Sequence, residues 1–558
     1  MTGPVRTIWV LLAFGTALGA PLLTYLGVIL ESDDVLYARL ASDMAEGHPT
    51  FGINTHTYRL GFLVPMAALY HVFGVHDWTT VAFPLLSSLT CVLVAGYAAD
   101  RLYGGSAGAW AALLCGFNPI LYRFGSTGLA DIPAGLLYGL FVVGWVLIVT
   151  NCVERRRAWA LLSGLACAWA VATRESVAPM VLFTLAGFLF LGWRQATLRE
   201  FPIKEWVFGC AAIAGPYLLS LWWYTGTPLY FLHAAQGGYN FAGAPWLQPL
   251  EGLQLIARLT GLAIIRASIE GYLFVALPVV VVSALMGSAS GWDGDRSRLY
   301  LVLAVVSPLV TLSHFSTSFN QWSPIHLDLR FGGPILMPAG ILVAGACLRL
   351  PSVQATKVAQ GGTWVVLLLS LGLLGLGWLR QEKMLMIGAA ATALATLSVF
   401  LVHRMPKPFV PAVLALLLVG NWGIYKSQEY IEIKDRNSLN IKNAAMVPWD
   451  PSKPILTDEL TAQMLPYLHQ FEKVPAVATW KGPGEAKRPF YWTERIDGPL
   501  AEDYLLVWNP AEAGNQAKRW GTEVPPWVLE EVTRGRLVKE FSGEPGGGVY
   551  QIGRVRER

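Results

Sequence analysis

Two adjacent carboxylates follow the first long apolar stretch of the chain, in the segment Glu31-Ser32-Asp33-Asp34-Val35-Leu36-Tyr37. A chain that leaves a membrane at this point is expected to turn polar here. Such a pair can provide a general base, can ligate a metal ion, or can cap a helix that faces water. The pair alone leaves these alternatives open. We identify it as the candidate catalytic centre because other charged residues are expected on the same side of the membrane.

The composition is that of a polytopic membrane protein. Of the 558 residues, 54% are apolar and only 14% are charged, and the mean hydropathy is +0.46. A soluble domain has roughly a quarter of its residues charged. The net charge of +4 does not indicate a nucleic-acid partner, because the placement of Lys and Arg matters more than their sum in a membrane protein. The six cysteines lie within or beside apolar runs, so no disulfide framework is expected.

Apolar runs long enough to cross about 30 Å of hydrocarbon recur through the first 425 residues. The expected spans are residues 7–30, 79–99, 106–122, 131–150, 158–173, 176–193, 205–224, 262–287, 299–314, 332–348, 363–379, 384–402 and 409–425. We interpret the first as an uncleaved span, because it is longer than a signal-peptide core and Pro21 would impede cleavage. These spans, about thirteen, place the two ends of the transmembrane module on opposite sides of the membrane.

The basic residues support this topology. Alternate loops collect most of the Lys and Arg on one side, as the positive-inside rule requires, although Arg123, Arg380 and Lys383 fall on the other. The same-side residues are Arg101, Arg155, Arg156, Arg157, Arg194, Arg199, Lys204, Arg296, Arg298, Arg349, Lys357, Arg404 and Lys407. We therefore expect a multi-pass protein of the cell inner (cytoplasmic) membrane, with a cytoplasmic N-terminus and a periplasmic or otherwise extracytoplasmic C-terminal segment.

Two loops on the outer side are long. The first, residues 31–78, contains semi-apolar helical stretches at 35–46 and 61–73 that are too short or too mixed to span, so we expect them to lie along the membrane surface. The second, residues 224–261, is rich in Gly, Pro and aromatic residues. That composition suits either the wall of a groove at headgroup depth or an interfacial aromatic belt.

The composition becomes polar from residue 426. Short strand-like runs occur at 455–457, 474–480, 504–508, 537–541 and 549–552, with a helical stretch at 458–471. This pattern predicts a small α/β domain over residues 426–558, outside the membrane, after a mainly α transmembrane module of residues 1–425. The domain shows no catalytic motif. It is expected either to cover an acceptor site or to be a structural cap.

Charged residues gather at the outer ends of the expected spans: Asp33, Asp34, Arg59, Asp131, Arg174, Glu175, Asp328 and Arg330. An unpaired ionisable side chain within a span costs roughly 3 kcal/mol, so their recurrence on one side predicts a shared polar cavity. Arg presents a planar fork that suits phosphate oxygens and stabilises the charge on a leaving phosphate. A carboxylate can take the proton of an attacking hydroxyl, and Asp33 is the candidate for that base.

Local motifs extend this interpretation. They are Asp33–Ala38, Ala45–Gly47, Tyr58–Phe62, Gly128–Pro133, Ala172–Glu175, and Leu329–Pro334 followed by Met337–Ala339. In type, order and side of the membrane they are similar to motifs of the polyprenyl-phosphate-dependent integral-membrane glycosyltransferases of the GT-C class. The branch that the chain resembles includes the protein O-mannosyltransferases and the bacterial aminoarabinose transferases of lipid A. The resemblance implies a GT-C fold with surface-lying helices in the first outside loop.

The resemblance also implies an activity. A single sugar would pass, with inversion, from an undecaprenyl- or decaprenyl-phosphate donor to a hydroxyl of a glycan, lipid or protein acceptor at the outer face. Asp33 would be the general base, with Asp34 and Asp131 positioning the acceptor or tuning the base. Neighbouring carboxylates are expected to raise the pKa of one another. Arg174 and Arg330 would hold the donor phosphate, and the further candidates are Arg59 for the phosphate and Tyr37, Glu175 and Asp328 for additional contacts.

The sequence departs from the family pattern at a few positions. Phe331 stands where tyrosine is usual, Leu60 where proline is usual and Asp34 where glutamate often follows. No cofactor is required by this chemistry. A divalent metal between Asp33, Asp34 and Asp131 is an alternative that no ligand spacing supports.

Two other classes of function stay open. A transporter or flippase of a lipid-linked or sugar substrate would place ionisable residues near the membrane midplane, often in repeated halves. An enzyme like the O-antigen ligases or polymerases would move an oligosaccharide from a diphosphate carrier. The motifs do not specify the sugar, the acceptor or the oligomeric state.

Overall fold

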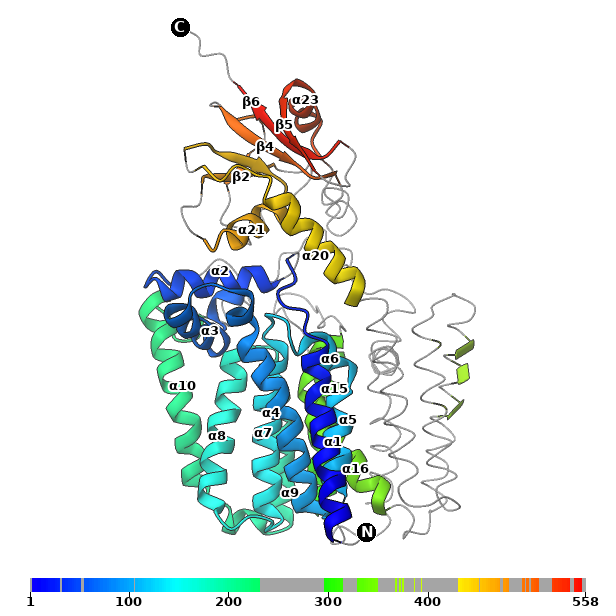
Figure 1. Ribbon diagram of the computed structural model, residues 1–558. Helices are drawn as coiled ribbons and strands as arrows, with labels where there is room; N and C mark the ends of the chain where they lie inside the picture. Colours follow the sequence, from blue (N-terminus) through cyan, green and yellow to red (C-terminus); the bar gives the residue numbers. More distant parts are fainter. Residues whose placement is uncertain are drawn as a thin grey trace.

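The structure is a computed structural model that describes residues 3–30, 33–51, 55–104, 106–230, 296–314, 329–349, 430–450, 452–471, 475–480, 494–496, 498–500, 503–510, 524–541 and 546–553, with isolated positions between 367 and 393. Long helices form a bundle, and a small sheet lies beyond one end of it (Figure 1). The bundle helices are α1 (Gly3–Leu23), α4 (Asp77–Tyr103), α5 (Ala107–Gly116), α6 (Pro119–Phe124), α7 (Asp131–Val149), α8 (Arg156–Thr173), α9 (Val177–Arg194), α10 (Ile203–Thr225), α15 (Arg296–His314) and α16 (Gly333–Arg349).

The bundle confirms the predicted multi-pass membrane class. Within the described residues, five helices are long and apolar enough to cross a membrane, namely α4, α7, α9, α10 and α15. Other predicted spans overlap with α1, α5, α8 and α16. The spans expected at 262–287, 363–379, 384–402 and 409–425 lie outside the continuously described residues, as does most of the loop at 224–261. The count of about thirteen spans stays a prediction.

Helix α7 lies at the centre of the bundle. Tyr138, Phe141 and Trp145 are fully buried on it, and the helix is apolar on all sides, as a surrounded helix must be. The Tyr138 hydroxyl donates to the carbonyl of Ala304 on α15 at 2.8 Å and contacts the Thr184 hydroxyl on α9 at 2.7 Å. Because α7 begins at Asp131, a rigid central element carries one of the predicted site carboxylates.

The first loop folds as predicted into two short helices, α2 (Asp33–Ala45) and α3 (Leu60–Phe73), joined through the 3₁₀ turn η1 (Thr55–Tyr58). Helix α2 runs across the end of the bundle, at a steep angle to the long helices (Figure 1). Tyr37 of α2 packs edge-on against Phe62 of α3, with ring centroids 4.8 Å apart. The two helices thereby form a single layer over one end of the bundle.

The first span is shorter than predicted. Helix α1 ends at Leu23, and residues 25–29 are not helical. Gly27 has φ +76°, and a Cβ there would lie 2.3 Å from Asp77 Oδ2. The freed backbone amides donate to distant side chains: Val28 to Asp77 Oδ1 at 2.8 Å and Leu26 to Ser126 Oγ at 3.1 Å. These contacts satisfy the backbone amides without a helix. The apolar composition of residues 24–30 therefore predicted a longer span than the structure has.

The span expected at 106–122 is divided. Helix α5 ends at Gly116, and α6 begins at Pro119. Asn118 caps α6 by accepting from the Ile120 amide at 3.0 Å. Proline suits the first turn of a helix, where its missing N–H costs nothing, and the cap and proline together start a new helix here.

The C-terminal region is an α/β unit, as predicted. Its sheet has the order β3-β2-β1-β4-β6-β5, in which β3, β2, β1 and β4 are parallel and β6 runs antiparallel to β4 and β5. The strands are β1 (Ile455–Thr457), β2 (Val477–Trp480), β3 (Glu494–Ile496), β4 (Tyr504–Trp508), β5 (Arg536–Glu540) and β6 (Gly548–Ile552), and the helices are α20 (Ile431–Ala444), α21 (Glu459–Leu468) and α23 (Pro526–Arg534). Strand β3 and helices α20 and α23 were not predicted.

This α/β unit rests on the first loop. Helix α21 lies above α2 (Figure 1), and Tyr467 and Phe471 share a buried apolar cluster with Val35 of α2. The Arg39 guanidinium lies 5.1 Å from the centre of the Phe471 ring. From α20, the Asn437 side-chain amide donates to the carbonyl of Val28 at 2.9 Å. The sheet region is therefore fixed to the segment that leads into Asp33.

Candidate active site

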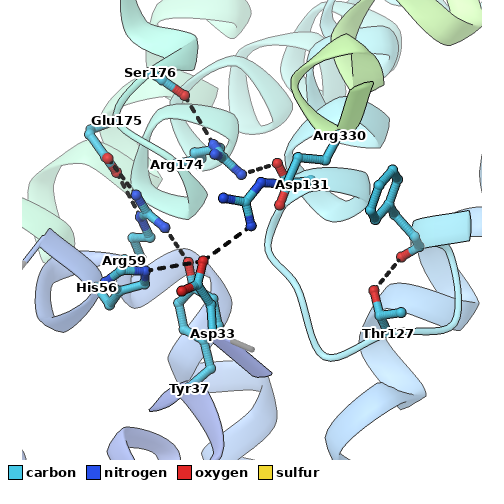
Figure 2. Close-up of polar contacts among 11 residues, drawn as sticks. Asp33, Tyr37, His56, Arg59, Thr127, Asp131, Arg174, Glu175, Ser176 and Arg330 are labelled. Atoms are coloured by element: carbon cyan, nitrogen blue, oxygen red, sulfur yellow. Dashed lines mark hydrogen bonds and ion pairs between the residues drawn. The ribbon is translucent and has the colours of Figure 1, made fainter. Parts of the chain in front are cut away.

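Most of the charged residues singled out in the sequence converge at the end of the bundle that carries α2 (Figure 2). Five elements bring them there: Asp33 and Tyr37 lie on α2, Arg59 precedes α3, Asp131 begins α7, Arg174 and Glu175 link α8 to α9, and Arg330 lies in the 3₁₀ turn η5 (Leu329–Gly332). Asp328 lies outside the described residues. The predicted clustering of cations and carboxylates on one side is thus present in the fold.

Close backbone packing sets the position of Arg330. A Cβ on Gly135 of α7 would lie 2.6 Å from the carbonyl carbon of Gly333, so α16 begins in direct contact with the first turn of α7. Arg330 immediately precedes this contact. The glycines explain how η5 comes close enough to α7 for the two segments to form one site.

The pair formed by Asp33 and Arg330 is partly open to solvent. Arg330 Nη1 donates to Asp33 Oδ2 at 3.1 Å. The Asp33 side chain is 38% exposed and the Arg330 side chain 27% exposed. The same carboxylate oxygen lies 3.7 Å from His56 Nε2. A carboxylate and a cation are therefore both accessible to a ligand at this point.

Arg174 and Asp131 form a second, buried pair. Arg174 Nη1 donates to Asp131 Oδ1, and the two side chains are only 8% and 2% exposed. Arg174 Nε also donates to Ser176 Oγ at 3.0 Å. The Phe331 ring lies 4.4 Å from the Arg174 guanidinium and 5.3 Å from that of Arg330. Phe331, in place of the usual tyrosine, thus contacts both cations through its ring face.

Arg59 and Glu175 form a third pair. Arg59 donates from Nε to Glu175 Oε2 at 2.8 Å and from Nη2 to Oε1 at 2.5 Å, a bidentate arrangement. Arg59 Nη1 also donates to the Tyr37 hydroxyl. Burial would raise the pKa of Glu175, but the charge and hydrogen bonds of Arg59, with the charge of Arg174, outweigh it and lower the pKa to about 2. Glu175 is therefore ionised and neutralises Arg59.

Asp34 faces away from Asp33. Its side chain is fully buried, and Oδ2 accepts from the backbone amides of Gly128 at 2.7 Å and Ile29 at 3.3 Å. Successive residues of a helix point about 100° apart, so neighbours in sequence do not share a face. The structure gives Asp34 contacts that hold two connecting segments in place beneath Asp33.

The prediction that neighbouring carboxylates raise the pKa of the base is wrong for Asp33. Burial favours a higher value, but the polar contact with His56 and the positive charges around the carboxylate together hold the pKa of Asp33 well below its usual range. The charges include those of Arg330 and Arg59. Asp33 faces cations, whereas Asp34 points elsewhere. The cationic neighbours therefore decide the direction in which the pKa of Asp33 shifts.

His56 is a further residue of the site, and the sequence patterns did not predict it. It lies in η1, three residues before Arg59, and its side chain is 9% exposed. Residues three apart in a 3₁₀ turn lie on the same side, so the spacing from His56 to Arg59 is a signal that could have found it. Among the described residues, no group of three or more potential metal-ligating side chains is placed to hold a metal ion.

Comparisons with known proteins bear on this site. Residues 62–223 match the family model described as dolichyl-phosphate-mannose-protein mannosyltransferase. Among curated proteins, none matches the sequence significantly. The crystal structure of ArnT from Cupriavidus metallidurans bound to undecaprenyl phosphate superimposes with a TM-score of 0.63 at 14% identity, over 98% of each chain. The apo structure of the same ArnT gives 0.60 at 14% identity, again over 98% of each chain.

At this level of identity, the structural likeness establishes the fold. The family-model match covers the chain from α3 to α10, a stretch that includes Asp131, Arg174 and Glu175. The family match and the fold together confirm the predicted resemblance of this membrane protein to the polyprenyl-phosphate-dependent glycosyltransferases of the GT-C class.

Proposed function

We propose that this protein transfers a single sugar from a polyprenyl-phosphate donor to an acceptor hydroxyl, with inversion at the anomeric carbon. The family match and the GT-C fold support glycosyl transfer as the reaction class. Undecaprenyl phosphate bound to the similarly folded ArnT supports a polyprenyl carrier, undecaprenyl or decaprenyl. The acceptor is a glycan, a lipid or a protein. The reaction takes place at the end of the bundle beneath α2, and the distribution of Lys and Arg in the sequence favours the outer face of the cytoplasmic membrane for this end.

The observation that carries this proposal is the difference in exposure among the three ion pairs. Arg59 and Arg174 are 6% and 8% exposed and are neutralised by Glu175 and Asp131. Asp33 and Arg330 are more exposed, at 38% and 27%, and lie beside these pairs. The accessible pair supplies a base and a phosphate-binding cation, the two groups that the transfer requires.

The donor phosphate and Asp33 compete for Arg330. In the proposed reaction Arg330 turns from Asp33 Oδ2 to the donor phosphate, and Arg174 adds a second cation behind Phe331. Losing the nearby cation raises the proton affinity of Asp33, which is ionised and ready to accept a proton. Donor binding thereby prepares the base.

Asp33 then takes the proton from the acceptor hydroxyl as its oxygen attacks the anomeric carbon. The bond from that carbon to the phosphate oxygen breaks, and its electron pair leaves with the phosphate. Arg330 and Arg174 stabilise this charge. The products are the glycosylated acceptor and polyprenyl phosphate, with the proton on Asp33. Asp131 and Glu175 position the arginines, Asp34 positions the backbone around the base, and Tyr37 positions Arg59 through its hydroxyl.

The test uses purified full-length protein in liposomes with labelled undecaprenyl- and decaprenyl-phosphate sugars and membrane-extracted acceptors. Release of polyprenyl phosphate is measured for the wild type, for Arg330→Ala and for a control, Arg157→Ala. Arg157 is 86% exposed and pairs with Glu205. We expect Arg330→Ala to lower kcat/KM by about 100-fold or more, as removal of an oxyanion-stabilising group does, while the control matches the wild type.

Other results would favour the other classes. Wild-type protein that releases nothing from any monophosphate donor contradicts the proposed function. Movement of intact lipid-linked sugar across the liposome would then indicate a transporter or flippase. Release of a polyprenyl diphosphate from an oligosaccharide carrier would indicate an enzyme like the O-antigen ligases.

A further inference from the structure

His56 is held against Asp33 from the side opposite Arg330, the cation of η5. Its Nε2 lies 3.7 Å from Asp33 Oδ2, the oxygen that also accepts from Arg330 (Figure 2). The ring of Tyr37 packs edge-on against the imidazole, with centroids 5.0 Å apart and planes at 65°. The His56 side chain is only 9% exposed. The imidazole is thus fixed at the carboxylate that the proposed reaction uses.

When Arg330 moves from Asp33 to the donor phosphate, Asp33 needs another hydrogen-bond donor to hold its orientation. Asp33 Oδ2 would lose its guanidinium donor at the step when the carboxylate must point at the acceptor. His56 Nε2 lies at the same oxygen, slightly beyond hydrogen-bonding distance. Catalytic hydrogen bonds are often long in unliganded enzymes and tighten in the substrate complex.

We propose that His56 is a positioning residue for Asp33: its neutral imidazole donates from Nε2 to Asp33 Oδ2 once Arg330 binds the donor, and this leaves Oδ1 directed at the acceptor hydroxyl. This role rests on the proposed function, because it assigns Asp33 as the base. Protonation of His56 switches the base off, since a second full positive charge beside the carboxylate lowers its proton affinity.

The groups that face His56 determine the sign of its pH dependence. They are Asp33 and Tyr37 from α2, Arg59 from the start of α3, and Glu175 from the link between α8 and α9. Burial and the Arg59 charge lower the pKa of His56, and Asp33 and Glu175 oppose this without reversing it. The imidazole is therefore neutral at pH 7 and gains a proton only at a more acidic pH than a free imidazole does. The rate of sugar transfer should therefore fall as His56 gains its proton, which gives the pH–rate profile an acid limb.

Three variants separate this role from packing. His56→Phe keeps a ring against Tyr37 and removes the donor. His56→Asn keeps a neutral N–H donor and removes the titration. His71→Asn is the matched control, because His71 is exposed in the last turn of α3. The measurements are kcat, the donor KM and the rate between pH 5 and 8, for full-length protein in liposomes, with thermal unfolding to verify folding.

We expect His56→Phe to lower kcat by about tenfold to a hundredfold, the effect of losing a hydrogen bond to a charged group, with the donor KM changed by less than about threefold. His56→Asn should recover most of that loss and flatten the acid limb. The control should keep the wild-type kcat and acid limb.

Unchanged kcat in folded His56→Phe, or an unaltered acid limb in His56→Asn, overturns the role of His56 alone. A change confined to the donor KM overturns it as well, because that would indicate a donor contact. Wild-type protein without turnover overturns the proposed function, and the role of His56 with it.

Discussion

The three arginines of the site differ in their surroundings rather than in their chemistry. Arg59 and Arg174 are buried and are held by carboxylates, because a buried charge that lacks a partner is strongly unfavourable. Arg330 is held by Asp33 in the most exposed of the three pairs. Side chains that are buried and paired are suited to positioning, whereas the exposed pair is suited to exchange with a ligand. Glu175 is the clearest case of a positioning carboxylate.

Glu175→Gln should destabilise the protein, because it leaves the buried Arg59 guanidinium without its counter-charge. We expect the free energy of unfolding at pH 7 to fall by about 1–3 kcal/mol. The depressed pKa of Glu175, about 2, contributes stability that is present above the unfolded value near 4.3 and is lost as the pH falls toward 2. The wild type and Glu175→Gln should therefore differ above about pH 4.5 and converge below it.

Thermal unfolding in detergent over pH 2.5–7 checks this expectation, because this range covers most of the interval between the unfolded pKa near 4.3 and the folded pKa of about 2. The control is Glu200→Gln, because the Glu200 side chain is 69% exposed and pairs with Arg156 at the surface. A stability difference that persists unchanged at the lowest pH would show that Glu175 acts through packing rather than through its charge.

The first two residues of helix α2 are both acidic, but they face different neighbours. Asp33 begins the helix on the side of Arg330, whereas Asp34 turns to the backbone amides of Ile29 and Gly128. The segment before α2 and the turn before α7 are thereby fixed to the same helix. The position of Asp33 therefore depends on contacts made by Asp34, the residue next to it.

Asp34→Ala should loosen both segments, because it removes the acceptor of the buried Gly128 amide and of the part-buried Ile29 amide. Each such amide costs about 1–3 kcal/mol when unsatisfied. We expect lower thermal stability, faster hydrogen exchange at the amides of Ile29 and Gly128, and a lower kcat because Asp33 is displaced. Asp100→Ala is the matched control, because Asp100 is exposed near the C-terminal end of α4. Wild-type exchange at both amides would contradict this role.

The sequence predicted the elements that depend on local pattern. Apolar runs predicted the long helices, and the mixed runs at 35–46 and 61–73 predicted α2 and α3. The end of α1 at Leu23 was not predictable, because the carboxylate and hydroxyl that satisfy residues 26 and 28 come from Asp77 and Ser126, far along the chain. The pairing of Asp33 with Arg330 likewise joins residues 297 apart. By contrast, helical geometry alone predicts that the side chains of Asp33 and Asp34 point in different directions.

The molecule encloses α2 between two units. The bundle lies below this helix, and α21 of the α/β unit lies above it (Figure 1). The hydroxyl of Tyr467 from α21 lies 3.4 Å from that of Thr80 at the start of α4, so the α/β unit also reaches the bundle itself. The C-terminal unit therefore packs directly on the helix that carries Asp33.

The central claim is that Asp33 accepts the proton of the acceptor hydroxyl. The most direct measurement is the single-turnover release of polyprenyl phosphate by Asp33→Asn, compared with wild type and with Asp100→Asn, each verified as folded by thermal unfolding. We predict that Asp33→Asn loses about 100-fold to 10,000-fold of the rate, as removal of a general base does, with donor binding retained and the control unaffected. A folded Asp33→Asn protein that releases polyprenyl phosphate at the wild-type rate would contradict the account.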